Sequence, residues 1–305
     1  MKPRLAVLDA PSNLGLRPPA AGAVPGCYKL AGALRDHGLL SRLAARDAGY
    51  LTPPRYDRQG WKPGDGVFNA AAIAGYSVRL ADRVGGLVDA GEFPVVLGGD
   101  CSILLGTALA LRRRGRFGLA FLDGHSDFRH PGNAAGVGAA AGEDMALVTG
   151  RGQPDLTDLD GLRPYVGDGD VGLIGIREAD EYADELRMLG IPFWPSERLR
   201  DDGATEALAG ALAHLERAEL DGFWVHFDVD ILDPTVMPAV DSPDPGGIGH
   251  LELRALLAGL VGSRRCIGLE VTVFDPDLDP GGFLAAELAE TLIAGVQDGF
   301  GVRVD

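Results

Sequence analysis

Short runs of apolar residues alternate along this chain with longer segments in which apolar residues recur at helical spacing. Runs that are apolar throughout are typical of parallel strands buried on both faces of a sheet. The pattern therefore predicts an α/β protein in which helices cover both faces of a central parallel sheet. The predicted strands are Leu5–Leu8, Pro94–Leu97, Leu119–Leu122, Gly172–Ile176, Phe223–Phe227 and Ile267–Val273.

The helical segments lie between these strands, and neither a Pro/Ser-rich linker nor a repeat of fixed period divides the chain. We therefore predict a single domain over residues 1–305. Two glycine-containing segments, Leu51–Gly66 and Arg129–Gly142, are predicted to be loops, and both are candidates for the border of a pocket. The predicted helices are Ala70–Asp89, Ser102–Arg113, Thr205–Ala218, Leu251–Val261 and Leu284–Val296.

The chain carries 44 acidic and 28 basic side chains, which gives a formal net charge of −16. This balance argues against nucleic acid or an anionic membrane as a partner, and it suits a cationic substrate or bound metal ions as well as plain solubility. The three cysteines, Cys27, Cys101 and Cys266, are not clustered, which predicts a reducing compartment without disulfides. Because signal-peptide features and a run of about 18 apolar residues are absent, we expect a cytoplasmic protein that spans no membrane.

Acidic and metal-binding residues directly follow four of the predicted strands. The segments GGDCS, DGHSD and DVDILDP follow the strands that end at Leu97, Leu122 and Phe227, and Glu270 follows Leu269. The carboxyl ends of parallel strands meet at one edge of a sheet, where ligands of open α/β sheets bind. The sequence therefore predicts that these segments converge on one site.

The spacing of these residues favours a metal site. Asp123, His125 and Asp127 alternate along the chain, as do Asp228 and Asp230, and alternate residues of an extended strand point the same way. Carboxylates placed so close together repel unless a cation or a proton lies between them. Carboxylate with imidazole suits Mn²⁺, Zn²⁺ or Fe²⁺ better than Ca²⁺ or Cu⁺. Either pattern alone is also common on solvated loops, but together they predict one or more divalent ions.

In this order and spacing, GGDCS, DGHSD and HFDVDILDP resemble the three metal-binding motifs of the arginase/agmatinase/formiminoglutamase superfamily, written GGDH, DAHxD and SxDxDxxDP. The resemblance covers nearly the whole chain, to Glu270. It implies an arginase-like three-layer α/β/α sandwich around an eight-stranded parallel sheet, assembled as homotrimers or homohexamers. It also implies two Mn²⁺ ions bridged by a hydroxide, which attacks the guanidino carbon of arginine or a similar guanidino acid.

The same resemblance assigns roles to single residues. Asp123 and Asp228 would bridge the two ions, and Glu270 would receive the guanidinium group. Asp180 matches the aspartate that holds the substrate's α-amino group, and Arg129 stands where arginases have the asparagine that meets the substrate carboxylate. The implied catalytic residues are Asp127, His125 and Glu270, and the implied metal ligands are Cys101, Asp123, His125, Asp127, Asp228 and Asp230.

Cys101 departs from the family pattern, which has a metal-binding histidine at this position. Three interpretations of Cys101 are open. It binds a metal as a thiolate, or it is neutral and binds no metal, or it marks a site that has lost one of the two ions. A thiolate beside four carboxylates would weaken Mn²⁺ binding and favour a softer ion such as Zn²⁺. The segment 143–146, which resembles the family's H-G-x-P, lacks the proton-shuttle histidine, and His130 is a nearby substitute. His226 either orients Asp228 or is a packed core histidine.

Three functions compete. Hydrolysis of arginine or an arginine-like guanidino acid is favoured, because Asp180 and Arg129 offer one anion and one cation to a zwitterion. An agmatinase-like or formiminoglutamase-like activity, or a metal-binding regulatory protein without catalysis, is the alternative. A single-zinc deacetylase of related fold is disfavoured, because the pair of catalytic histidines it needs is missing beside the metal motifs. We expect a small guanidino compound and further copies of this chain as partners.

Overall fold

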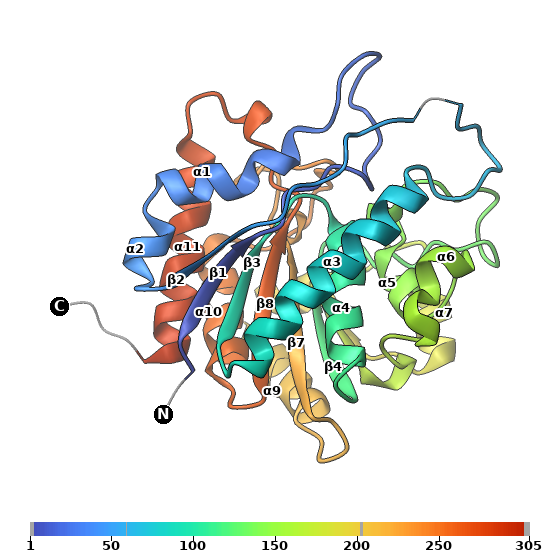
Figure 1. The fold of residues 1–305 in the computed structure, drawn as a ribbon. Coiled ribbons are helices and arrows are strands. Elements are labelled where there is room, and N and C mark those ends of the chain that lie inside the picture. The colour runs from blue at the N-terminus through green and yellow to red at the C-terminus, as the bar shows by residue number, and fades with distance from the viewer. Residues whose placement is uncertain (1–2, 59, 202–203, 302–305) are drawn as a thin grey trace.

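A computed structural model describes residues 3–58, 60–201 and 204–301 of the chain. Its described part contains one sheet of eight strands, all parallel, in the order β2-β1-β3-β8-β7-β4-β5-β6 (Figure 1). The predicted parallel α/β architecture is therefore confirmed. The strands are β1 Leu5–Asp9, β2 Arg46–Tyr50, β3 Phe93–Leu97, β4 Phe117–Leu122, β5 Val171–Ile174, β6 Phe193–Trp194, β7 Gly222–Asp228 and β8 Cys266–Thr272.

All six predicted strands are present, with ends that shift by one or two residues. The two strands that the sequence pattern missed, β2 and β6, lie at the two edges of the sheet. Strand β2 has the sequence RDAGY and is half exposed, and β6 has only two residues. An edge strand is buried on fewer sides, so it needs no continuous apolar run, and its sequence carries no strong signal.

Helices cover both faces of the sheet and form the outer layers of a three-layer sandwich. One apolar core joins one face to α1, α2, α8, α9, α10 and α11, and the other core joins the opposite face to α3, α4, α5, α6 and α7 (Figure 1). The bounds are α1 Leu30–Asp36, α2 Leu39–Arg42, α3 Ala70–Asp89, α4 Leu104–Arg112, α5 Asp144–Val148, α6 Pro154–Thr157, α7 Ala183–Leu189, α8 Ser196–Asp201, α9 Ala204–Leu215, α10 His250–Gly262 and α11 Phe283–Phe300.

The five predicted helices are all present, and α3 has the predicted bounds. The predicted helix Ser102–Arg113 begins differently, with a 3₁₀ turn at Cys101–Ile103 that leads into α4. The cause is Asp100, whose Oδ1 accepts a hydrogen bond from the Ser102 amide at 2.9 Å and so caps the turn. This cap fixes the backbone of Cys101 at the end of β3.

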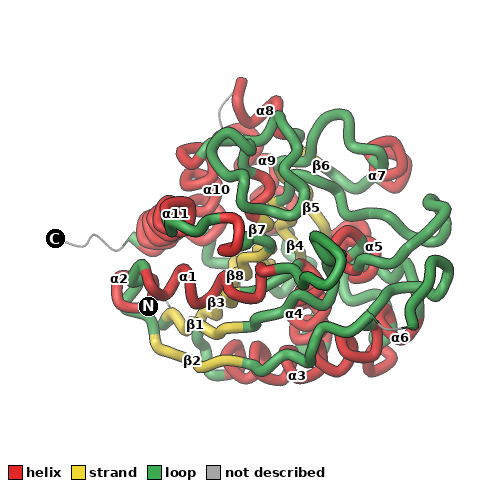
Figure 2. Tube along the Cα trace, turned by 90° about the horizontal axis from the view of Figure 1, so that it is seen from above, coloured by secondary structure: helices red, strands yellow, loops and turns green. Residues whose placement is uncertain are grey.

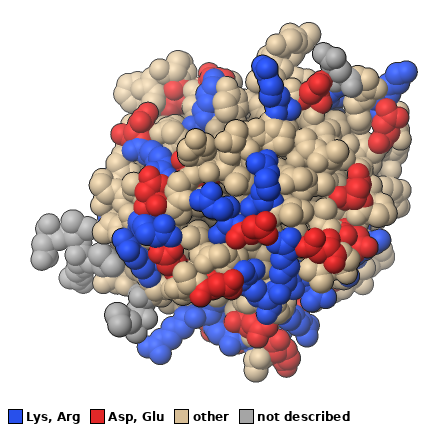
Figure 3. Space-filling model, in the orientation of Figure 1, with Lys and Arg blue, Asp and Glu red and all other residues tan. Residues whose placement is uncertain are grey.

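Seen from above in Figure 2, loops cover the edge of the sheet at which the strands end. The face seen in Figure 3 carries many basic side chains, with acidic side chains among them. Exposed ion pairs in the structure include Arg113 with Asp82 and Arg114 with Asp89. Exposed pairs of this kind contribute little to stability. Within the described residues, no helix combines the length and the apolar character needed to cross a bilayer.

Candidate metal centre

The three sequence motifs meet at the middle of the sheet, because β3, β8, β7 and β4 are neighbours in the strand order. The turn after β3 needs glycine at position 99. A Cβ atom there would lie 1.9 Å from the carbonyl oxygen of Ser12, which is too close for any side chain. Asp100 tightens the same contact, since its Oδ2 accepts a hydrogen bond from Ser12 Oγ at 2.6 Å. Asp100 is thus a residue of the turn.

The alternation of Asp123, His125 and Asp127 predicted that the second motif continues its strand, but the structure differs. Strand β4 ends at Leu122, and Asp127 adopts a left-handed backbone conformation with φ +43°. The Asp127 carbonyl accepts a hydrogen bond from the Ala146 amide at 3.2 Å, so α5 holds this turn in place. The side chains converge because the chain folds back, and a non-glycine residue with positive φ is typical of a strained functional site.

One group of candidate ligands consists of Asp123, His125 and Asp230, whose ligand atoms all lie within 4.8 Å of one another. His125 Nδ1 lies 2.9 Å from Asp230 Oδ2. The other ring nitrogen, Nε2, lies 3.1 Å from Oδ2 of Asp244. Arg177 holds the Asp244 segment, since its guanidinium donates to the backbone carbonyls of Asp244 at 2.8 Å and of Asp230 at 3.0 Å.

A second group surrounds Cys101, which is completely buried. Its Sγ lies 2.6 Å from Asp228 Oδ2 and 3.0 Å from the Thr272 hydroxyl. Sγ also lies within 4.8 Å of ligand atoms of two further carboxylates, Asp127 and Asp144, and separately within 4.8 Å of His226. The structure therefore brings together all six predicted metal positions, in two adjacent groups.

Burial and mutual repulsion dominate the electrostatics of the centre. Burial, with repulsion from neighbouring carboxylates, raises the pKa values of Asp123, Asp144 and Asp228 well above their ordinary range. Burial likewise raises the pKa of Asp127 to about 7. For the Cys101 thiol, burial and then the nearby Asp228 raise the pKa well above its ordinary value. A balancing cation is what would allow these groups to ionise together at neutral pH.

The His125–Asp230 pair behaves differently. Burial alone would lower the pKa of His125, but the Asp230 carboxylate beside it raises this pKa to about 10. Burial would raise the pKa of Asp230, yet the facing imidazolium holds it below its ordinary value. A metal ion bound here by the imidazole would have to displace the ring proton, so binding would release it.

Buried polar atoms that lack a hydrogen-bond partner show whether this centre is suited to hold metal ions. Among the residues that the structure describes, four atoms of this region are buried without a hydrogen-bond partner: Asp123 Oδ2, Asp144 Oδ2, His226 Nε2 and Glu270 Oε2. Leaving such atoms unpaired costs roughly 1–3 kcal/mol each, or more for charged groups. Together with the other carboxylates, the His125 ring and the Cys101 sulfur, these atoms provide enough ligands for two divalent cations.

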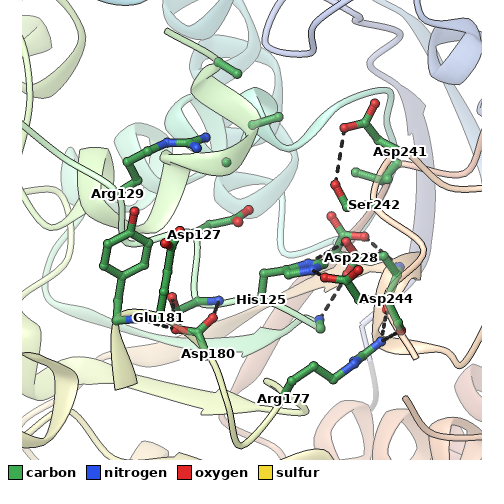
Figure 4. Close-up of a pocket in the computed structure, with 18 of the residues that line it drawn as sticks. His125, Asp127, Arg129, Arg177, Asp180, Glu181, Asp228, Asp241, Ser242 and Asp244 are labelled. Carbon is green, nitrogen blue, oxygen red and sulfur yellow. Dashed lines mark hydrogen bonds and ion pairs between the residues drawn. The ribbon is translucent and has the colours of Figure 1, made fainter. Parts of the chain in front are cut away.

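A cavity of about 610 Å³ opens above the centre and is lined by His125, Asp127, Asp228 and Asp230. Figure 4 shows His125 and Asp228 between two charged walls. Arg129, Asp180 and Glu181 form one wall, and Asp241, Ser242, Asp244 and Arg177 form the other. The acidic loop that carries Asp241 and Asp244 is therefore part of the cavity wall, and the two residues predicted to bind the substrate, Arg129 and Asp180, also line the cavity.

Glu270 lies deeper than the cavity wall. Its side chain is completely buried in β8, lies outside the residues that line the cavity, and has Oε1 2.9 Å from His226 Nδ1. Its other oxygen, Oε2, is buried without a hydrogen-bond partner among the described residues. The residue of this segment that reaches the cavity is Val273, three positions later, with φ +76°. A contact between Glu270 and a substrate stays a prediction.

Other residues were missed or placed differently. Asp144 had no assigned role, because it lies far from the three motifs in sequence and only the fold brings it to Asp127. Arg177 gave no signal, since its contacts are with backbone carbonyls. His130, the candidate proton shuttle, does not line this cavity, and its Nε2 lies 3.1 Å from Glu185. His226 is packed in the core, stacked on the Phe121 ring at 4.7 Å.

Residues 27–296 match the sequence profile of the arginase family. The arginase of Bacillus caldovelox is 29% identical over 283 residues, covering 92% of this chain and 93% of its own, and that of Brevibacillus brevis is 28% identical over 284 residues, covering 92% and 93%. The crystal structure of Bacillus caldovelox arginase superposes with a TM-score of 0.85 at 27% identity, covering 97% of this chain and 98% of that one.

The fold and the paired ligand groups thus define a metal-dependent hydrolase of the three-layer α/β/α class. The chain belongs to the arginase family, whose members are metal-dependent amidinohydrolases with a dinuclear centre.

Proposed function

We propose that this enzyme hydrolyses the guanidino C–N bond of arginine or an arginine-like guanidino acid, and releases urea or a urea analogue and an amine. Two divalent ions would serve as cofactors, with Mn²⁺ the first choice because carboxylates dominate the ligand set, and with Zn²⁺ or another softer ion favoured near Cys101. The arginases of Bacillus caldovelox and Brevibacillus brevis support the reaction class.

The observation that carries this proposal is the distribution of charge around the cavity. Arg129, whose Nε lies 3.5 Å from Glu143 Oε1, presents a cation on the wall that also carries Asp180 and Glu181, while Asp241 and Asp244 present anions on the other (Figure 4). An amino acid with a guanidinium tail carries one anion and two cations at matching places. Its carboxylate would pair with Arg129, its α-amino group with Asp180, and its guanidinium would lie beside the acidic loop.

The candidate substrate contacts are held in place before any substrate arrives. Asp180 accepts hydrogen bonds from the Ser126 amide at 2.9 Å, the Ser126 hydroxyl at 2.8 Å and the Tyr182 amide at 2.9 Å. Oδ1 of Asp180 already accepts two of these hydrogen bonds, whereas Oδ2 accepts one and keeps a lone pair for a ligand, because an ionised oxygen accepts about two hydrogen bonds. Preorganisation of this kind reduces the entropic cost of orienting a substrate.

The ions, when bound, would supply a hydroxide at neutral pH and stabilise negative charge at the attacked carbon. The chain's own contribution is to fix the ligands. Asp244 orients the imidazole of His125 from the side opposite Asp230, and Arg177 restrains the backbone of Asp244. Asp123 and Asp228 are both buried, which strengthens the electrostatic interactions of their carboxylates.

A substrate panel with Mn²⁺, Co²⁺ or Zn²⁺ added tests the proposal by urea release from L-arginine, agmatine and other guanidino acids. We expect carboxylated substrates to be preferred, and Arg129→Met to raise their KM by about 10- to 100-fold, the value of a hydrogen-bonded charge pair. Agmatine lacks the carboxylate and serves as the control, since its KM should hardly change. Equal losses for agmatine and arginine would contradict the role of Arg129.

A metal-binding protein without hydrolysis is the second candidate, and Cys101 favours it, because a thiolate near the ions lowers their Lewis acidity. If protein that binds two ions released no urea from any substrate of the panel with any of the three metals, this second function would be supported and the first contradicted.

A further inference from the structure

Two buried atoms below the cavity have no role in the proposed reaction. His226 Nε2 and Asp144 Oδ2 lie 3.7 Å apart, both side chains are completely buried, and neither atom has a hydrogen-bond partner among the residues that the structure describes. A buried carboxylate oxygen and a buried ring nitrogen that face each other without a shared hydrogen bond leave a gap lined by electron pairs. A divalent cation placed there would accept both electron pairs.

The hydrogen bond on the far side of the ring decides which electron pair of His226 is available. Nδ1 lies 2.9 Å from Oε1 of Glu270, and a carboxylate at this distance suits the tautomer that carries its proton on Nδ1. In that tautomer the lone pair lies on Nε2, the atom 3.7 Å from Asp144 Oδ2. A metal-bound histidine typically donates its other ring nitrogen to a carboxylate, which fixes the tautomer and orientation. Glu270 and His226 have this arrangement before any ion is considered.

The same place is one residue short of the family's ligand set, because Cys101 stands where the motif has histidine. Cys101 Sγ lies within 4.8 Å of ligand atoms of His226 and Asp228, and within 4.8 Å of ligand atoms of Asp127 and Asp144. The imidazole that is missing at the end of β3 is thus present inside β7, which β8 separates from β3 in the sheet. Thiolate, imidazole and carboxylate together are the ligands that Zn²⁺ and Co²⁺ accept most readily.

We propose that the ion at the Cys101 position is bound by His226 through Nε2 and by Asp144 through Oδ2, in addition to Cys101, Asp127 and Asp228. Glu270 is then a positioning residue that holds the imidazole, and this position selects a thiolate-binding cation over Mn²⁺. The inference rests on the proposed function only in placing this ion in the hydrolytic centre, and it is tested by binding alone.

The first test uses Co²⁺ alone as the probe, added to the metal-depleted full chain under reducing conditions. Two ions should bind, and one should show the sulfur-to-cobalt charge-transfer absorption of a thiolate ligand. Cys101→Ser should abolish this band. Cys266→Ala is the matched control, because Cys266 is equally buried but its Sγ contacts only the Gly268 carbonyl, at 3.6 Å, among the described residues. A parent protein without the band would overturn the proposal.

Two further variants test the new ligands. Asp144→Asn removes a charge, and His226→Asn keeps a donor near Nδ1 for Glu270 while it removes Nε2. Each should weaken the ion at the Cys101 position by about 100-fold or more and leave the other ion within about threefold, whereas Glu270→Gln should weaken it by about 10- to 100-fold. If both Asn variants bound two ions with the parent's affinities and spectrum, neither residue would be a ligand.

A measurement on the unmodified protein removes any dependence on how the variants fold. X-ray absorption of the zinc-loaded chain should show sulfur at about 2.3 Å and two imidazoles for two ions, one from His125 and one from His226. A single imidazole for two ions would overturn the assignment of His226. These experiments do not read urea release. A chain that binds the ions in this way but hydrolyses no guanidino compound would refute the proposed function and leave the metal assignment intact.

Discussion

Asp233 holds the acidic wall of the cavity, and its removal gives a sharp test of the structure. Its Oδ1 accepts hydrogen bonds from the Thr235 amide at 3.0 Å and hydroxyl at 2.7 Å, and its Oδ2 accepts from the amides of Gly246 at 2.8 Å and Gly247 at 3.2 Å. These bonds join the end of the third motif to the segment that carries Asp244. Asp233→Ala should therefore destabilise the protein and loosen this wall.

The expected loss is about 2 kcal/mol of unfolding free energy. Four buried hydrogen bonds to a carboxylate would contribute more than this to the unfolding free energy. Asp233 is partly exposed, so water can replace its partners, and the expected loss is reduced for solvent screening. Asp233→Asn is the matched control: it keeps the shape and an acceptor oxygen but not the charge, and should lose about half as much. Urea unfolding of metal-free parent and variants at pH 7 measures both values.

The pH dependence gives the same prediction an independent test. The hydrogen bonds from Thr235 lower the folded-state pKa of Asp233 to about 2, whereas an unfolded aspartate titrates near about 3.9. The stabilisation by the charge is therefore complete above about pH 4 and is lost as the pH falls toward 2. The difference between parent and Asp233→Asn should shrink over this range. An alanine variant within about 0.5 kcal/mol of the parent at pH 7, or a parent–Asn difference that grows on acidification, would refute this reasoning.

Three further predictions concern single residues. Cys101→His should strengthen Mn²⁺ binding by about tenfold or more in a calorimetric titration. An unchanged affinity would show that Cys101 is not the ligand that weakens Mn²⁺ binding. Asp244→Asn should weaken the ion at His125 by about 10- to 100-fold, because the ring loses its carboxylate partner; equal loss at both ions would contradict this. Asp170→Asn, which leaves two arginines without their buried partner, should reduce stability by about 2–3 kcal/mol in urea, while the exposed Asp184→Asn should change it by less than about 0.5 kcal/mol, and similar losses would argue against a buried pair.

The sequence predicts most of the fold and the metal positions for the same physical reason. Central parallel strands must be apolar on both faces, so they stand out as continuous runs, and their carboxyl ends are defined by the runs themselves. Once Leu97, Leu122 and Phe227 are recognised as ends of neighbouring strands, the acidic residues that follow must meet. The edge strands β2 and β6 escape because partial burial leaves their composition unconstrained.

Residues that act through tertiary contacts could not be predicted in this way. Asp144 reaches Asp127 because α5 packs beneath the turn after β4, and no spacing within the sequence encodes that distance. The contact between Glu270 and His226 depends on the register of β8 with β7, in which the two residues lie opposite each other. That register is a property of the folded sheet, and no spacing within the sequence predicts it.

The departures of this chain from the family motifs at Cys101, Asp144 and His226 therefore need not be three separate changes. Cys101, Asp144, His226 and Glu270 come from four different segments, yet they meet in one buried volume. A histidine on β7 with its carboxylate partner on β8 is costly in a core unless its free nitrogen has a use, and a cysteine at a ligand position weakens the centre unless another donor compensates. Each departure is unfavourable alone, and they become consistent when a single ion is bound by the relocated imidazole and the thiolate together.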